Sequence, residues 1–254
     1  MASRSTETAS KSSILIAAAR IVALVILFLV CVPIHLVTKL VRRRSFWPWR
    51  FLAMSAWICG ARVRVTGRWF RPHTLLVCNH TSWLDILVLG GVSGCVFVSK
   101  HELGHSLVHW MANQADTLYV HRDHRRGAPH QAEALARQLE DPQPVALFPE
   151  GTTGPGTHLL PFRSTLFAAV APPPSGVTVR PVAIDYGPLA AELGWYEEPG
   201  IKNVLRTLGR SSTIPVNLRL LDPLPPMSDR KALTQAARDS IADALAFGGG
   251  GANL

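Results

Sequence analysis

A long apolar stretch near the start of the chain is the feature that most restricts its fold. The 24 residues from Ile14 to Val37 include only two ionisable or strongly polar side chains, Arg20 and His35. A helix of this length would reach about 36 Å, enough to cross the hydrocarbon core of a bilayer. The basic run KLVRRR follows at residues 39–44, and basic residues on that flank favour the cytoplasmic side for everything after it. The sequence therefore predicts an N-terminal membrane helix, and not a cleaved signal peptide, which would need a short basic start and a small-residue cleavage site.

The next segment, residues 45–65, combines three tryptophans with three arginines. This composition is typical of a helix at a membrane interface, where indole rings lie near the lipid head groups. The alternative is a first core helix whose indoles pack inside the protein. We expect four parts in the chain: a disordered start over 1–12, a membrane anchor with interfacial helices over 13–60, a folded domain over 61–247 and a flexible tail over 248–254.

Beyond residue 60, short β-rich runs alternate with segments of helical periodicity. The expected strands are 61–65, 74–78, 95–99, 117–121, 144–148, 177–184 and 215–221, and the expected helices are 82–90, 102–114, 129–140, 163–170 and a last one from Ser228. Such alternation predicts a layered α/β domain in which helices cover a central sheet.

The formal net charge of +9 at pH 7 indicates an anionic partner, such as nucleic acid, a phosphorylated substrate or acidic lipid. The basic residues lack the aromatic interleaving of a nucleic-acid platform, so no nucleic acid is expected as a partner. The four cysteines form no CxxC pair, which favours free thiols in a reducing compartment.

The first candidate for chemistry is CNHTSWLD, residues 78–85, at the end of an expected strand. His80 and Asp85 can meet only if His80 lies in the turn before a helix and Asp85 in its first turn. Asp85 would then hold one imidazole nitrogen and leave the other free as a general base. Ser82 with Asp85 also fits a helix capping box, which needs no chemistry. The motif alone leaves both interpretations open.

The second candidate is FPEGTTG, residues 148–154, which also follows an apolar run. Its glycines allow backbone amides to approach a ligand, and its threonine hydroxyls are donors suited to a phosphate or ester oxygen. A plain turn is the structural alternative. The carboxylate of Glu150 at a strand end favours a functional role, because open α/β sheets place their sites there.

Together, NHTSWLD and FPEGTTG resemble the first and third motifs of the lysophospholipid (1-acyl-sn-glycerol-3-phosphate) acyltransferase family, the first being its HxxxxD motif. TLYVHR, residues 117–122, resembles the second block, and VRPVAI, residues 179–184, resembles the fourth. The resemblance covers roughly residues 60–190. It implies the layered glycerolipid-acyltransferase fold, with a mixed, mostly parallel central sheet flanked by helices, plus an N-terminal membrane helix or helical hairpin.

The resemblance also implies an O-acyltransferase of lipid biosynthesis that needs no metal and no cofactor. His80 would be the general base on a free hydroxyl of a lysolipid, with Asp85 as its orienting partner. The acyl donor would be a thioester of acyl carrier protein or coenzyme A. The substrate-binding positions implied by the match are Asn79, Arg122, Glu150, Gly151, Thr152, Thr153, Arg163 and Pro181. The expected location is the inner membrane, among membrane phospholipids, with the acyltransferase domain on the cytoplasmic side.

The acceptor is less sharply defined because the motifs depart from the family pattern. Thr153 stands where members that form phosphatidic acid often have arginine, and Arg163 occupies a position where lysine is common. The EGTT sequence also resembles the branch that acylates lyso-ornithine lipid. We expect acyl transfer to lysophosphatidic acid, giving phosphatidic acid. Lyso-ornithine lipid is the alternative acceptor, and a non-catalytic lipid-binding scaffold is a third hypothesis.

Three further patterns carry weaker hypotheses. Cys78 would share a strand face with His80 and could be an acyl-accepting nucleophile, although a small buried hydrophobe is favoured. HELGH, residues 101–105, matches the HExxH zinc pattern, but Met111 stands where a third histidine would be, so we expect no zinc. HRDHRRG, residues 121–127, could dock an acidic carrier protein or coenzyme A phosphates; a solvated turn is favoured.

Overall fold

The computed structural model describes residues 2–42, 45–100, 106–120 and 128–246. Their strands form one sheet in the order β1-β7-β6-β2-β5-β3-β4. The strands are β1 Ala61–Gly67, β2 Thr74–Cys78, β3 Val96–Lys100, β4 Leu118–Val120, β5 Val145–Leu147, β6 Thr178–Asp185 and β7 Ile214–Leu220. All neighbours are parallel except β6 and β7. The predicted mixed, mostly parallel sheet is confirmed, and each predicted strand overlaps an observed one.

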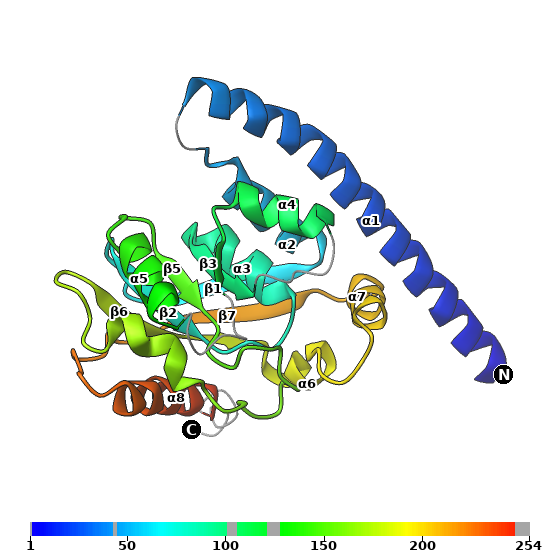
Figure 1. The fold of residues 1–254 in the computed structure, drawn as a ribbon. Coiled ribbons are helices and arrows are strands. Elements are labelled where there is room, and N and C mark those ends of the chain that lie inside the picture. Colours follow the sequence, from blue (N-terminus) through cyan, green and yellow to red (C-terminus); the bar gives the residue numbers. More distant parts are fainter. Residues whose placement is uncertain (1, 43–44, 101–105, 121–127, 247–254) are drawn as a thin grey trace.

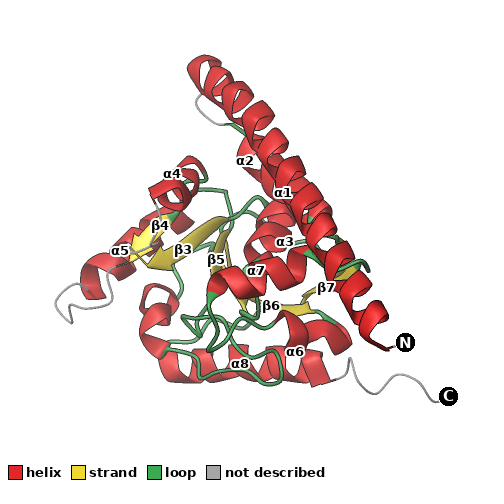
Figure 2. Ribbon diagram, turned by 90° about the vertical axis from the view of Figure 1, so that its right-hand side faces the viewer, coloured by secondary structure: helices red, strands yellow, loops and turns green. Residues whose placement is uncertain are grey.

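Helices cover both faces of this sheet (Figure 1 and Figure 2). They are α1 Ala2–Val41, α2 Trp47–Ile58, α3 Leu84–Ser93, α4 Ser106–Gln114, α5 Ala128–Leu139, η2 Ser164–Val170, η3 Gly187–Leu189, α6 Ala190–Leu193, α7 Gly200–Leu208 and α8 Arg230–Ala246. One hydrophobic layer joins α1, α2, α3, α6 and α7 to the sheet, and a second joins α5, η2 and α8. The segment 163–170, predicted as an α-helix, is a 3₁₀-helix, a form typical of short pieces.

The central strand β2 is buried along its whole length. Leu75 and Val77 belong to the layer of α5 and α8, whereas Leu76 and Cys78 belong to the layer of α3. This follows from the alternation of side chains along a strand that has both faces covered. Each fully buried leucine or valine contributes about 1.5–3 kcal/mol to folding. The carboxyl end of β2 is therefore held firmly in place.

Helix α1 runs along the outside of the domain as a single long helix (Figure 1). Its segment Lys11–Val41 is long and apolar enough to cross a membrane, with a mean hydropathy of 3.0, and only 17% of its most apolar window is buried. Residues 1–12 were predicted to be disordered, but the helix already begins at Ala2. Residues 1–12 contain neither glycine nor proline, so nothing in them stops a helix from extending towards the N-terminus.

The two polar residues of the apolar stretch both bind the domain. Nη1 of Arg20 donates to the carbonyl oxygen of Leu208, 3.0 Å away, at the C-terminus of α7. His35 is 5% exposed, and its ring nitrogens contact Ser45 Oγ at 2.9 Å and Gln114 Oε1 at 3.2 Å. Buried polar groups require such partners. These contacts fix α1 against the domain near both ends of its apolar segment.

Helix α2 has one buried side and one exposed side. Ala56 is buried in the same hydrophobic cluster as the sheet residue Leu76. Trp57, one position further, is 63% exposed. The helix also approaches α3 closely, because a Cβ added at Gly91 would lie 2.6 Å from the backbone of Ala53. One side of α2 therefore packs into the core, and the other side exposes the indole of Trp57 at the surface.

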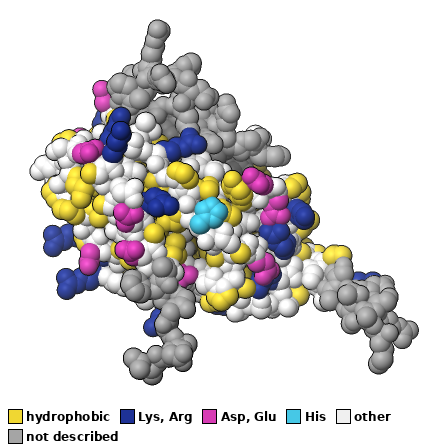
Figure 3. All heavy atoms as spheres, turned by 90° about the horizontal axis from the view of Figure 1, so that it is seen from below, with side chains coloured by type: hydrophobic (Ala, Val, Ile, Leu, Met, Phe, Trp, Pro, Cys, Tyr) yellow, Lys and Arg dark blue, Asp and Glu magenta, His cyan; other side chains and the backbone are white. Residues whose placement is uncertain are grey.

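The face that carries α6 and α8 has a different character. Seen from below, it shows basic and acidic side chains interspersed with hydrophobic ones (Figure 3). Mixed charges of this kind are typical of a solvated protein surface. The long apolar helix α1 lies on another side of the molecule (Figure 1).

Candidate active site

Three adjacent parallel strands end at one edge of the sheet. β2 ends at Cys78, β5 at Leu147 and β6 at Asp185, and β2 pairs with both of the others. Because the carboxyl ends of parallel strands meet at the same edge, the residues that follow them lie together. The first and third sequence motifs, which contain His80 and Glu150, meet here.

His80 and Asp85 form the contact predicted from their spacing. His80 lies in the turn before α3 and Asp85 in its first turn, and His80 Nδ1 lies 2.9 Å from Asp85 Oδ2. The side chain of Asp85 is fully buried, whereas that of His80 is 14% exposed. A carboxylate only accepts hydrogen bonds, so Nδ1 carries the proton and Nε2 keeps a free lone pair. The pair therefore has the geometry of an oriented general base.

The carboxylate of Asp85 accepts three further hydrogen bonds. Its Oδ2 accepts from the backbone N–H groups of Thr81 and Ser82 at 2.7 and 2.9 Å, and its Oδ1 accepts from the hydroxyl of Tyr186 at 2.6 Å. These donors hold the carboxylate in one orientation. The bond from Ser82 is also half of the capping box expected at the start of α3. The capping role and the orienting role of Asp85 therefore coexist.

The ring of His80 also stacks on Phe148, the residue that follows β5. The ring centroids are 4.1 Å apart, and the planes differ by 18°. Phe148 is itself 8% exposed and packs within the core cluster. The imidazole is thus held by a hydrogen bond at one nitrogen and by an aromatic face along its plane.

Glu150 holds the backbone of the site. Its Oε1 accepts from the N–H of His80 at 2.7 Å, and its Oε2 accepts from the N–H of Leu160 at 2.9 Å. The side chain is 4% exposed. Burial raises the pKa of Glu150 to about 7, although the two amides act in the opposite direction. Both carboxylate oxygens are thus used within the protein, and the substrate-binding role implied by the family resemblance stays a prediction.

Three loops are joined around the histidine. The N–H of Gly154 donates to the carbonyl oxygen of His80 at 2.7 Å, and the N–H of Trp195 donates to that of Thr81 at 3.0 Å. The hydroxyl of Thr153 donates to the carbonyl oxygen of Trp195 at 2.5 Å. Thr153 thus connects the third motif to the loop after α6, and its predicted contact with substrate stays a prediction.

Two other predicted substrate-binding residues are engaged inside the sheet. The side-chain amide of Asn79 donates to the carbonyl oxygen of Ile184 at 3.0 Å and accepts from its N–H at 2.8 Å, which ties the end of β2 to β6. Pro181 is buried within β6, opposite Val77 of β2. A buried amide has to be paired, and here the partner is backbone. These positions support the fold of the site.

The remaining described candidates lie nearer the surface. Thr152 is exposed, and Gly151 has a φ of 75°, a left-handed conformation that favours glycine. Arg163 is exposed, and its backbone N–H donates to the carbonyl oxygen of Pro149 at 3.0 Å, next to Glu150. Substrate binding by these three residues stays a prediction.

Several predictions concern residues outside the described part of the chain. These are Arg122, the HELGH segment 101–105 and the basic segment 121–127. Among the described residues, no group of three or more His, Cys, Asp or Glu side chains could hold a metal ion. The expected absence of zinc stays a prediction.

The nucleophile hypothesis for Cys78 finds no support. Its side chain is fully buried within the core. Burial raises the pKa of its thiol well above the ordinary value, whereas a nucleophilic cysteine needs its thiolate. Cys78 packs as a small hydrophobic residue.

Tyr186 and Phe148 were not singled out from the sequence. Tyr186 directly follows β6, which carries the fourth motif, and Phe148 directly follows β5. A signal was present, because residues that follow neighbouring parallel strands share an edge of the sheet. Using this signal requires the order of the strands in the sheet, and that order cannot be read from the sequence.

The site and fold can now be compared with known proteins. The Acyltransferase family model matches residues 62–185. A lyso-ornithine lipid O-acyltransferase from Pseudomonas aeruginosa is 34% identical over 217 residues, covering 82% of this chain and 81% of that protein. A protein of the same name from Rhizobium meliloti is 36% identical over 186 residues, covering 69% of this chain and 64% of its own length.

Two further comparisons concern glycerophosphate acyltransferases. A 1-acyl-sn-glycerol-3-phosphate acyltransferase from Neisseria gonorrhoeae is 33% identical over 129 residues, covering 50% of this chain and 46% of that protein. The crystal structure of PlsC, the 1-acyl-sn-glycerophosphate acyltransferase from Thermotoga maritima, shares the fold, with a TM-score of 0.56 over 81% of this chain and 79% of that one, at 22% identity.

A mostly parallel sheet with a histidine–aspartate pair at its carboxyl edge, together with these matches, defines an acyltransferase enzyme. The chain belongs to the lysophospholipid (1-acyl-sn-glycerol-3-phosphate) acyltransferase family. It is an acyltransferase of the lysolipid type, as the sequence analysis predicted.

Proposed function

We propose that the protein is a membrane-bound O-acyltransferase that moves a fatty acyl group from an acyl-carrier-protein or coenzyme A thioester to the free hydroxyl of a lysolipid. The observation that carries the proposal is the orientation of His80. Its Nδ1 is held by the buried carboxylate of Asp85, so Nε2 keeps its lone pair, and the side chain is 14% exposed. A general base must reach the proton that it removes, and this geometry meets that requirement.

The reaction follows from this arrangement. Nε2 of His80 takes the proton of the lysolipid hydroxyl as its oxygen attacks the thioester carbonyl carbon. The tetrahedral intermediate then collapses, the C–S bond breaks, and the thiolate leaves and takes the proton from the imidazolium. Asp85 stabilises that imidazolium and keeps the ring aligned. No acyl-enzyme is needed, because the thioester is already activated and the buried Cys78 cannot reach the substrate.

Lyso-ornithine lipid is the acceptor that we now place first. The motifs alone favour lysophosphatidic acid, but the relatives with that activity in their names match about half of this chain. Relatives named for lyso-ornithine lipid match up to 82% of it. The hydroxyl of Thr153 is also bound to a backbone carbonyl, at a position where members that form phosphatidic acid often have arginine. Lysophosphatidic acid remains the second candidate, because Arg163 offers a cation nearby.

The membrane association that we propose places one side of α1 in the lipid. Arg20 and His35 bind the domain, while Val22, Leu29 and their neighbours on the outer side are more than half exposed. Apolar side chains exposed in this way are stabilised by contact with acyl chains. The anchor would therefore enter the inner membrane alongside the domain, with the active site on the cytoplasmic side.

The experiment uses the full-length protein in phosphatidylcholine nanodiscs. Lyso-ornithine lipid and lysophosphatidic acid are offered in parallel, each with one acyl-carrier-protein donor and one coenzyme A donor, and products are identified by mass spectrometry. We expect product from lyso-ornithine lipid that is lost in His80→Ala. Transfer to lysophosphatidic acid alone would reverse the order of acceptors. Equal turnover by the wild type and His80→Ala would contradict the mechanism.

A further inference from the structure

A cavity lies at the opposite edge of the sheet from His80. Its volume is about 430 Å³, within the range of small-molecule sites. It is lined by Thr74 and Thr178, where β2 and β6 begin, and by residues that follow β1 and β7. Along β2, Thr74 and His80 are six residues apart, roughly 20 Å in extended chain. The cavity is therefore separate from the acyl-transfer site.

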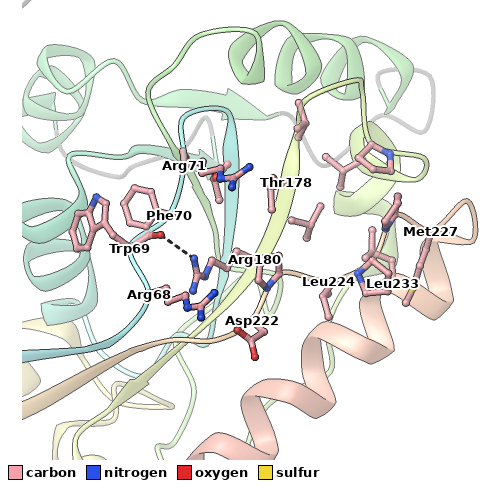
Figure 4. Close-up of a pocket in the computed structure, with 18 residues that line it drawn as sticks. Arg68, Trp69, Phe70, Arg71, Thr178, Arg180, Asp222, Leu224, Met227 and Leu233 are labelled. Atoms are coloured by element: carbon pink, nitrogen blue, oxygen red, sulfur yellow. Dashed lines mark hydrogen bonds between the residues drawn. The ribbon is translucent and has the colours of Figure 1, made fainter.

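One side of this cavity is strongly cationic. Arg68, Arg71 and Arg180 line it together with a single carboxylate, Asp222, and the close-up shows Arg68 and Arg180 near one another (Figure 4). No ion pair forms between Asp222 and these arginines in the described structure. Three guanidinium groups against one carboxylate leave a formal charge of about +2 at the cavity, which suits a dianion.

The guanidinium of Arg180 is held in a fixed position by the fold. The side chain is 4% exposed and donates to three backbone carbonyl oxygens, those of Leu221 at 2.5 Å, Trp69 at 3.3 Å and Leu220 at 3.4 Å. These acceptors hold the guanidinium without neutralising it. Burial lowers the pKa of Arg180, Asp222 raises it and Arg68 lowers it. Arg68 and Arg180 therefore repel each other, and a bound anion would relieve that repulsion.

The other side of the cavity is apolar. Leu224 and Met227, in the loop after β7, and Leu233 of α8 lie opposite the arginines (Figure 4). Leu233 is 1% exposed and belongs to the core layer of α8. The cavity is thus amphipathic, with a cationic end and an apolar end, and this division indicates the chemistry of its ligand.

We propose that this cavity binds an anionic amphiphile, with a phosphate monoester head held by Arg68, Arg71 and Arg180 and an alkyl chain lying against Leu224, Met227 and Leu233. Arginine pairs with phosphate in a bidentate manner, and the +2 charge matches a phosphate monoester better than a carboxylate. The site is non-catalytic, because no histidine or carboxylate base faces the proposed head group except the exposed Asp222. It does not depend on which acceptor the enzyme uses, so either proposal can fail alone.

The test uses the full chain in phosphatidylcholine nanodiscs and an alkyl phosphate with a diazirine in its chain. This probe has no hydroxyl to be acylated. After irradiation, labelled peptides are mapped by mass spectrometry. We expect labelling within residues 222–233, reduced about a hundredfold in Arg68→Gln/Arg71→Gln, because each of the two charge-assisted bonds lost contributes about a factor of ten. Acyl transfer by the same variant should match the wild type.

Matched samples separate the alternatives. Arg137→Gln removes another exposed arginine, on α5 and absent from the cavity lining, and should label like the wild type. Met227→Asp should abolish labelling through the apolar end. Phosphatidic acid added to the nanodiscs should compete, whereas inorganic phosphate at the same concentration should not. Undiminished labelling in Arg68→Gln/Arg71→Gln, equal labelling by an uncharged alkyl glucoside probe, or equal competition by inorganic phosphate would each overturn the proposal.

Discussion

The hydroxyl of Tyr186 donates to Oδ1 of Asp85 at 2.6 Å, while Oδ2 of the same carboxylate holds His80. Tyr186 is 1% exposed and follows β6, whereas Asp85 is in the first turn of α3. The orientation of the proposed base therefore depends on two segments that are about a hundred residues apart in sequence. Buried hydrogen-bonded chains of this kind make each member sensitive to loss of the next.

Replacing Tyr186 by phenylalanine should lower kcat about tenfold and leave both KM values nearly unchanged, because one hydrogen bond to Asp85 is lost while the ring keeps its packing. Steady-state kinetics with each substrate varied would show this. Tyr196→Phe is the matched control, since Tyr196 is 43% exposed. A Tyr186→Phe enzyme as fast as the wild type would refute the positioning role.

Asp85→Asn should reduce kcat by about 10² to 10⁴, because the amide can present an N–H to Nδ1 and favour the wrong imidazole tautomer. The measurement is single-turnover acyl transfer, with thermal unfolding to confirm that the fold remains. Cys78→Ala should keep its activity, as expected for a core residue. Loss of activity in Cys78→Ala without loss of stability would revive the nucleophile hypothesis.

Glu150 should make the stability of the protein depend on pH. Its pKa is raised to about 7 in the folded state and is near 4.3 when unfolded. The folded state thus binds more protons between these values, and the free energy of unfolding falls as pH rises from about 4.3 to 7, by up to about 4 kcal/mol. In Glu150→Gln this component disappears, so its unfolding midpoint should fall less over the same window. Identical pH profiles for the two proteins would contradict this.

Arg163→Gln should raise the KM for a lysolipid with an anionic head about tenfold, with little change in kcat, if this exposed cation meets the acceptor near the third motif. Kinetics on both acceptors would reveal whether the effect is larger for lysophosphatidic acid. Arg163→Lys keeps the charge and should restore most of the affinity. An unchanged KM in Arg163→Gln would remove this residue from the acceptor site.

Val22→Asp/Leu29→Asp should release the protein from vesicles, because the two side chains lie about 20° apart around α1 and are both more than half exposed. Losing two apolar contacts with lipid should weaken membrane partitioning about a hundredfold or more. Vesicle flotation measures this, and Val22→Ala/Leu29→Ala should give an intermediate effect. Flotation equal to the wild type would show that this side of α1 does not contact lipid.

Much of the fold was predictable, because it follows from local pattern. The β-rich runs and the amphipathic segments each correspond to an observed element, since strand and helix periodicity act over a few residues. The pairing of His80 with Asp85 was also within reach, because both belong to one turn. The order of the strands brings Glu150 to His80 and Tyr186 to Asp85. This order depends on pairing between segments far apart in the chain and was not predictable from local pattern.

Four motif positions show why a substrate contact is hard to assign from sequence. Asn79, Glu150, Thr153 and Pro181 match substrate-binding blocks, yet the structure engages them with backbone or packs them in the sheet. A polar residue in a motif can serve a ligand or a neighbouring loop, and the sequence does not separate these possibilities. Only the positions of their partners, such as Ile184 and Trp195, decide between them.

The contacts of Arg20 and His35 have a consequence for the design of altered enzymes. These residues are fifteen positions apart, which on a helix means roughly 22 Å along the axis and about 60° around it. Together they set both the axial position and the rotation of α1 against the domain. If α1 enters the bilayer as proposed, a foreign apolar helix of equal length would replace its contact with lipid, but it would leave the active site without a defined angle to the membrane plane. Anchor exchange should therefore carry this arginine and histidine into the new helix at the same separation.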